Sequence, residues 1–123
     1  MPQALRILVV DDSPPMRIVL RDYLEKAGHV VVAEVDNQEQ ALKEYAAHTP
    51  DLVTLDLALV VGNGLGVLNA LREVDPKARV LVISGNSQQK LLDRVKASGA
   101  GAILHKPFEP GELAQALAQV MAA

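Results

Sequence analysis

Short apolar runs alternate along the chain with longer segments in which apolar residues recur every three or four positions. The runs occupy residues 7–10, 30–35, 52–55, 80–83 and 102–104, and most of their members are Val, Ile or Leu. Because the runs are nearly continuous, each predicts a strand that is buried on both faces of a sheet. Strands of this kind are typical of parallel sheets that carry helices on both sides.

The segments between the runs predict amphipathic helices. The apolar face of the first helix is formed by Met16, Leu20, Tyr23, Leu24 and Ala27. Ser13 is suited to cap the N-terminus of this helix, Pro14 to occupy its first turn, and Gly28 to end it. Asn37 with Gln40 resembles a capping box and predicts the start of the second helix.

Three further helices follow the same alternation. Leu65, Leu68 and Leu71 line the third, the fourth runs from about residue 87 to 98, and the last begins near Pro110 with Leu113, Leu117, Val120 and Met121 facing inward. Alternating strands and helices predict βαβ units. The expected fold is therefore α/β, with a five-stranded parallel sheet covered on both sides by five helices.

Composition narrows the class of protein. The chain has 123 residues, half of them hydrophobic, and no long linker, so we expect one compact domain over residues 1–123. There is no cysteine, and the N-terminus lacks the pattern of a secretory signal, which favours a cytoplasmic protein without a membrane span. The net charge of −3 arises from mixed signs without a basic block, so direct nucleic-acid binding is not expected.

Polar side chains follow four of the five predicted strands. Asp11 and Asp12 follow the first strand, Asp56 the third, Ser84 the fourth and Lys106 the fifth. In a parallel α/β sheet, ligands bind at the carboxyl ends of the strands, so these side chains should share one rim. Three carboxylates brought together repel one another unless a proton or a cation intervenes. All-oxygen ligation favours Mg²⁺, with Mn²⁺ as an alternative.

This arrangement resembles that of response-regulator receiver domains of the stand-alone chemotaxis type. The resemblance rests on Asp-Asp-Ser after the first strand, single Asp and Ser residues after the third and fourth, and Lys-Pro-Phe after the fifth, and it covers essentially the whole chain. It implies a flavodoxin-like, doubly wound sheet in the strand order 2-1-3-4-5. The family pattern makes Asp56 the phosphoacceptor, Asp11 and Asp12 the acidic pair that holds Mg²⁺, Ser84 the switch hydroxyl and Lys106 the active-site lysine.

The resemblance also implies how the site is used. Asp12 and Asp56 would touch the metal directly together with the backbone carbonyl of Ala58, whereas Asp11 would act mainly through water. Pro107 would follow a cis peptide bond that aims Lys106 into the rim. The protein would then catalyse only its own phosphorylation and dephosphorylation and is not otherwise expected to be an enzyme.

The implied partners are proteins. The phosphoryl donor would be a sensor histidine kinase or a phosphotransfer protein, and the output would pass through a face formed by the fourth helix, the fifth strand and the fifth helix. The chain would act as a monomer, with chemotaxis as one pathway. A phosphorelay intermediate and a receiver cut from a larger regulator fit the sequence equally.

Two other classes of protein use a similar fold. A magnesium-dependent aspartyl-phosphate hydrolase would carry its nucleophile in an Asp-x-Asp motif after the first strand, whereas Asp11 and Asp12 are adjacent. A flavin carrier would bind the flavin phosphate in a loop rich in hydroxyl and main-chain N–H groups, and two acids at that place would repel the phosphate. The receiver pattern also has two departures here: Val60 stands where proline is common, and Ile103 replaces the usual aromatic switch residue.

Overall fold

The computed structural model describes residues 4–59, 63–85 and 88–122, and strands and helices alternate along the chain. The strands are β1 (Arg6–Val10), β2 (Val30–Val35), β3 (Leu52–Asp56), β4 (Val80–Ser84) and β5 (Ala102–His105). The helices are α1 (Pro14–Lys26), α2 (Gln38–His48), α3 (Gly64–Val74), α4 (Gln89–Ala97) and α5 (Pro110–Ala122). The predicted succession of elements is thus confirmed.

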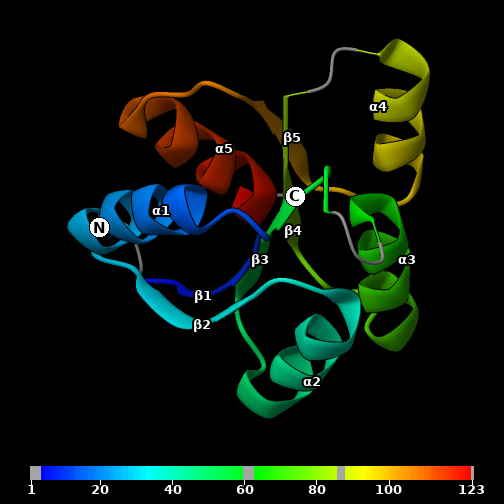
Figure 1. The fold of residues 1–123 in the computed structure, drawn as a ribbon, viewed down its shortest axis with the longest axis horizontal. Helices are drawn as coiled ribbons and strands as arrows, with labels where there is room; N and C mark the ends of the chain where they lie inside the picture. Colours follow the sequence, from blue (N-terminus) through cyan, green and yellow to red (C-terminus); the bar gives the residue numbers. More distant parts are fainter. Residues whose placement is uncertain (1–3, 60–62, 86–87, 123) are drawn as a thin grey trace.

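The strands form one parallel sheet in the order β2-β1-β3-β4-β5 (Figure 1). This is the flavodoxin-like order that the resemblance implied. The order reverses at β1, because the chain moves from β1 outward to β2 and then returns to the other side of β1 with β3. A ligand site is therefore expected between the carboxyl ends of β1 and β3.

Each face of the sheet has its own hydrophobic core. Helices α1 and α5 pack on one face through residues that include Leu20, Leu24, Leu113 and Leu117. Helices α2, α3 and α4 pack on the other face through residues that include Ala41, Leu68, Leu71 and Val95. Every residue of β3 and β4 is buried, which agrees with the continuous apolar runs in the sequence.

The predicted helix ends are largely confirmed. The Ser13 hydroxyl accepts a hydrogen bond from the Met16 N–H at 3.3 Å, and Gly28 has a φ of +91°, which suits glycine beyond a helix end. Ala27 was expected on the apolar face of α1 but is exposed, because it is the C-cap where the chain leaves the helix. None of the described helices is long and apolar enough to cross a membrane.

The fourth helix begins later than predicted. It starts at Gln89 rather than near residue 87, which itself lies outside the described residues. Its N-cap, Gln88, makes no capping hydrogen bond through its side chain, and glutamine is not a preferred N-cap residue.

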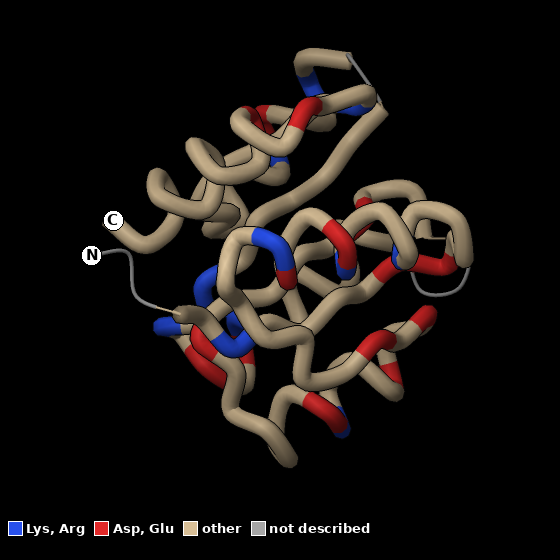
Figure 2. The backbone as a smooth tube through the Cα atoms, turned by 90° about the vertical axis from the view of Figure 1, so that its left-hand side faces the viewer, with Lys and Arg blue, Asp and Glu red and all other residues tan. Residues whose placement is uncertain are grey.

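Charged residues of both signs are spread along the backbone. Figure 2 shows acidic and basic positions next to one another in several parts of the view from the left-hand side of Figure 1. This mixture agrees with the small net charge of −3.

Candidate functional site

The carboxyl ends of β1 and β3 bring three acids together. Asp11 and Asp12 lie in the turn that leads from β1 into α1, and Asp56 is the last residue of β3. One carboxylate oxygen from each of the three lies within 4.8 Å of the others. The parallel sheet thus gathers acids that are 44 residues apart in the sequence, counting from Asp12 to Asp56.

Asp11 is the acid whose environment is least like water. Its side chain is 1% exposed, and its Oδ1 accepts a hydrogen bond from the Ser13 N–H at 2.8 Å. Its Oδ2 is buried and has no hydrogen-bond partner within the described parts of the chain. A buried carboxylate oxygen without a donor is costly, and it is suited to receive a cation.

Burial is also the main reason why the pKa of Asp11 is raised to about 6. The negative charges of Asp56 and Asp12 act in the same direction. The hydrogen bond from Ser13 and the positive charge of Lys106 lower the pKa of Asp11 and partly offset the rise. Asp11 therefore binds a proton more readily than a surface aspartate does.

Asp56 is held from two sides. It is 4% exposed, and its Oδ1 accepts a hydrogen bond from the Ala58 N–H at 2.9 Å. The ammonium group of Lys106, which follows β5, lies 3.4 Å from the same oxygen. The peptide bond between Lys106 and Pro107 is cis, as the sequence analysis expected. Asp56 is thus a buried carboxylate with one cation beside it.

Ser84 and Lys106 border one cavity next to Asp56. Ser84 ends β4 and is 1% exposed, and its carbonyl accepts a hydrogen bond from the Lys106 N–H at 2.9 Å. The cavity has a volume of about 360 Å³ and is lined by Leu57, Ala58, Ser84, Gly85, Leu91 and Lys106. It gives a small group access to the side of the site on which the hydroxyl and the ammonium lie.

The loop after β3 is anchored to α3 by a close contact that the sequence analysis did not identify. The Gly64 N–H donates a hydrogen bond to the Leu57 carbonyl at 3.2 Å. A Cβ atom on Gly64 would lie 2.5 Å from the Leu57 Cα, so only glycine fits without a shift of the main chain. The glycines of this loop were visible in the sequence, but the contact depends on how α3 lies against β3.

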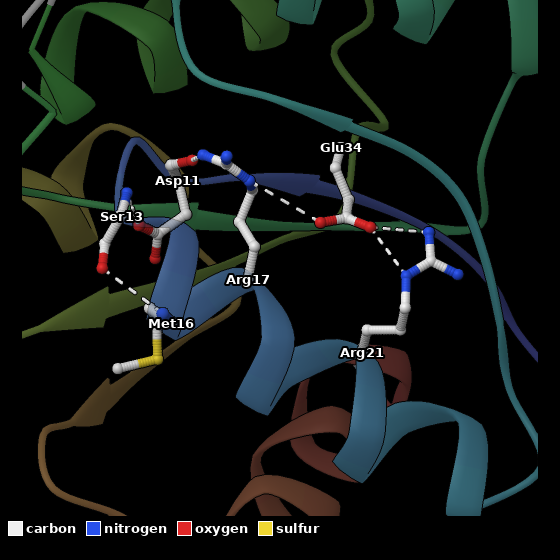
Figure 3. A network of polar contacts seen from close by, with 6 residues as sticks. All are labelled: Asp11, Ser13, Met16, Arg17, Arg21 and Glu34. Carbon is white, nitrogen blue, oxygen red and sulfur yellow. Dashed lines mark hydrogen bonds and ion pairs between the residues drawn. The ribbon is translucent and has the colours of Figure 1, made fainter.

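The turn that carries Asp11 and Asp12, called the acidic turn below, is supported by a contact that the sequence analysis missed. Arg17 of α1 donates a hydrogen bond to the main-chain carbonyl of Asp11 at 2.7 Å. Arg17 and Arg21 both pair with Glu34 of β2, so a polar network joins α1, β2 and the turn (Figure 3). The apolar spacing and the end signals of α1 predict the helix, but neither reveals this pairing.

The donor set fits a hard divalent cation. Three carboxylates, one of which has a buried oxygen without a donor among the described residues, supply only oxygen ligands. Mg²⁺ prefers such ligands and usually keeps several waters as well. The residues present therefore suit Mg²⁺.

Comparison with known proteins gives the family. The sequence model of the response regulator receiver domain matches residues 7–118. The chain belongs to this family. The receiver domain is a phosphoacceptor module of two-component signalling, so the chain is a response regulator of a two-component system.

The relatives of this receiver domain include chemotaxis proteins. It is 35% identical to chemotaxis protein CheY of Thermotoga maritima, over 94% of this chain and 96% of that protein. It is 37% identical to chemotaxis protein CheY of Bacillus subtilis, over 93% and 95% of the two chains. The crystal structure of a CheX-CheY-BeF3-Mg complex from Borrelia burgdorferi matches with a TM-score of 0.90 and 27% identity, covering 94% of this chain and 88% of that one.

The two departures from the receiver pattern lie in different surroundings. Ile103 is half-buried in β5, pairs with Val82 of β4 and packs against the core on the α2–α3–α4 side. Val60 lies outside the described residues. Asp11, Asp12 and Asp56 thus lie together at one edge of the sheet with Lys106 beside Asp56, and position 103 carries an aliphatic side chain.

Proposed function

We propose that this receiver domain, taken as residues 1–123, accepts a phosphoryl group on the carboxylate of Asp56. The observation that carries the proposal is the environment of Asp56. This carboxylate is 4% exposed, lies 3.4 Å from the Lys106 ammonium and shares a 4.8 Å cluster with Asp11 and Asp12. A nucleophile between a cation and a metal-binding acidic pair is what phosphoryl transfer requires.

Mg²⁺ is the proposed cofactor, and Mn²⁺ would suit the same oxygens. Asp12 and Asp56 would coordinate it directly together with the carbonyl of Ala58, while Asp11 would act mainly through water. When bound, the ion offsets the negative charge of the acids and of the phosphoryl group. The orphaned Oδ2 of Asp11 supports this assignment, because a cation would compensate its burial.

The transfer itself is a displacement at phosphorus. An Asp56 oxygen attacks in line with the P–N bond of a phosphohistidine, and the O–P bond forms as the P–N bond breaks. The electron pair stays on the imidazole nitrogen, which takes a proton from solvent. Lys106 offsets charge on the equatorial oxygens, and the Ser84 hydroxyl donates a hydrogen bond to them. Later attack by water returns the carboxylate and releases phosphate.

The proposed partners are a sensor histidine kinase or phosphotransfer protein and a downstream protein. We assign the output to the surface of α4, β5 and α5, where a hollow of about 440 Å³ includes Gln89, Ile103 and Gln119 in its lining. Chemotaxis is the proposed pathway, since the relatives from Thermotoga maritima and Bacillus subtilis are named chemotaxis proteins. A role as a phosphorelay intermediate would use the same Asp56 chemistry. The receiver domain would act as a monomer.

The assignment of Asp56 is tested by labelling with acetyl phosphate and Mg²⁺. Intact mass should rise by one phosphoryl group, the label should be lost in base, and a chelator should prevent its formation. Asp56→Asn should not be labelled. Asp22→Asn, which removes an exposed carboxylate on α1, is the matched control and should be labelled like wild type.

Two results would contradict the proposal. Labelling of Asp56→Asn to the wild-type level would show that another residue accepts the phosphoryl group. Sustained multiple turnover of a small-molecule phosphate ester by the wild-type protein would instead indicate a hydrolase.

A further inference from the structure

Arg17 contacts the acidic turn at its main chain rather than at its carboxylates. The Nη1 of Arg17 donates to the Asp11 carbonyl at 2.7 Å, and its Nε lies 3.6 Å from the Glu34 carboxylate (Figure 3). Arg17 belongs to α1, Glu34 to β2, and Asp11 to the turn that follows β1. One guanidinium therefore joins three segments at the edge of the site.

With this contact, both main-chain polar groups of Asp11 are held. Its N–H donates to the Val35 carbonyl of β2 at 2.9 Å, and its carbonyl accepts from Arg17. The side chain adds a third contact through the Ser13 N–H. Three hydrogen bonds thus hold Asp11 in place, although its carboxylate lies close to those of Asp12 and Asp56.

Glu34 keeps the Arg17 guanidinium in place. The side chains of Arg17 and Glu34 are each 24% exposed, so solvent screens their ion pair only in part. Arg21 pairs with the other oxygen of Glu34 at 2.6 Å, and its own side chain is 43% exposed. Within the described residues, the hydrogen bonds and ion pairs of Arg21 go to Glu34 and Glu25 and not to the acidic turn.

We propose that Arg17 is a positioning residue for the divalent-cation site, an inference that rests on the proposed function of the three acids. Repulsion among three carboxylates within 4.8 Å favours a turn that opens, and the hydrogen bond from Arg17 opposes this opening. A turn that is already fixed loses less conformational entropy when the ion binds. Contacts that orient metal-ligating side chains are worth about tenfold or more in metal affinity, and we expect the contact from Arg17 to act in the same direction through the main chain of the turn.

Arg21 provides the matched control. Arg17→Gln and Arg21→Gln each remove one ion pair to Glu34, but only Arg17→Gln removes the hydrogen bond to the Asp11 carbonyl. Arg21 contacts Glu34 at 2.6 and 2.7 Å, whereas Arg17 lies 3.6 Å from it, so a merely structural tie between α1 and β2 predicts at least as large an effect of Arg21→Gln as of Arg17→Gln. A positioning role predicts that Arg17→Gln weakens Mg²⁺ binding and that Arg21→Gln does not.

The experiment is a calorimetric titration of each metal-free protein with MgCl₂. Arg17→Gln should bind Mg²⁺ about tenfold more weakly than wild type, and Arg21→Gln should stay within about twofold of it. The rate of labelling by acetyl phosphate should need more Mg²⁺ for its half-maximum in Arg17→Gln, yet approach the wild-type rate at saturation. Arg17→Lys keeps a cationic donor and should bind Mg²⁺ more tightly than Arg17→Gln.

The outcomes separate this inference from the proposed function. Mg²⁺ affinity of Arg17→Gln within about twofold of wild type would overturn the positioning role, and so would an equal loss in Arg21→Gln. In both cases the Asp56 chemistry would stand. A wild-type protein that binds no Mg²⁺ would overturn the metal site and this inference with it.

Discussion

Replacing Asp11 by Asn should make the metal-free protein more stable at neutral pH. Asp11 is 1% exposed, and burial together with neighbouring negative charge raises its pKa from 3.8 to about 6. At neutral pH the folded protein therefore holds a charge that is better solvated in the unfolded chain. Asn keeps the shape, can accept the Ser13 N–H through Oδ1, and places an amide donor where the Asp11 Oδ2 has no partner.

The magnitude follows from the pKa of Asp11. A carboxyl group whose pKa is raised on folding binds its proton more tightly in the folded state, so its stabilising effect is complete below pH 3.8 and is lost as the pH rises through about 6. At ~1.4 kcal/mol for each pH unit between these values, the total loss is about 3 kcal/mol. Asn resembles the protonated side chain at every pH, so Asp11→Asn should escape this loss.

Urea unfolding in the presence of EDTA measures the difference. The free energy of unfolding of Asp11→Asn should exceed that of wild type by about 1 kcal/mol near pH 4.5 and by about 3 kcal/mol near pH 7.5. Asp22→Asn, at an exposed position, should follow wild type within about 0.5 kcal/mol at both pH values. An advantage of Asp11→Asn that does not grow with pH, or a variant less stable than wild type near neutral pH, would refute the burial argument.

Three further predictions concern the core, the loop after β3 and the switch. Thr54→Val should raise the free energy of unfolding by about 1 kcal/mol, because the buried Thr54 hydroxyl has no hydrogen-bond partner in the described structure; an equal gain in Thr54→Ser would contradict this. Gly64→Ala should lower the free energy of unfolding by about 2 kcal/mol or more in urea, since its Cβ would lie 2.5 Å from the main chain. Gly66→Ala, the control, should be neutral or slightly stabilising. Lys106→Ala should still be labelled by acetyl phosphate to some extent but lose the amide NMR shifts that beryllium fluoride with Mg²⁺ causes over α4, β5 and α5; undiminished shifts would exclude a switch role.

Most of the fold could be predicted because strands that are buried on both faces of a sheet have continuous apolar runs, which can be recognised in a single sequence. Continuous apolar runs placed every strand to within one residue at each end: the run at 7–10 became β1 (Arg6–Val10), and that at 102–104 became β5 (Ala102–His105). Local capping residues placed the start of α1, where Ser13 binds the Met16 N–H. The strand order had a different source, since no local pattern encodes it and only the family resemblance supplied it.

The three acids could be predicted for a related reason. Asp11, Asp12 and Asp56 follow strands directly, and the parallel sheet places the carboxyl ends of its strands at one edge. Their supports could not be predicted, because they depend on contacts between distant segments. The pairing of Arg17 with Glu34 requires α1 to lie along β2, and the approach of Gly64 to β3 requires the angle at which α3 enters.

The stability of the protein and its proposed chemistry depend on the same charge. The Asp11 carboxylate costs the metal-free fold about 3 kcal/mol at neutral pH by the linkage above, and a bound cation would recover part of that cost as binding free energy. If the turn could open freely, the three carboxylates would move apart and their repulsion would fall. A bound cation would then relieve less repulsion, and its binding free energy would be smaller. The contacts that hold Asp11, from Val35, Arg17 and Ser13, prevent this relief. The Mg²⁺-induced rise in melting temperature should therefore be smaller in Arg17→Gln than in wild type near neutral pH, and it should shrink in both proteins below about pH 6 as protons compete for Asp11.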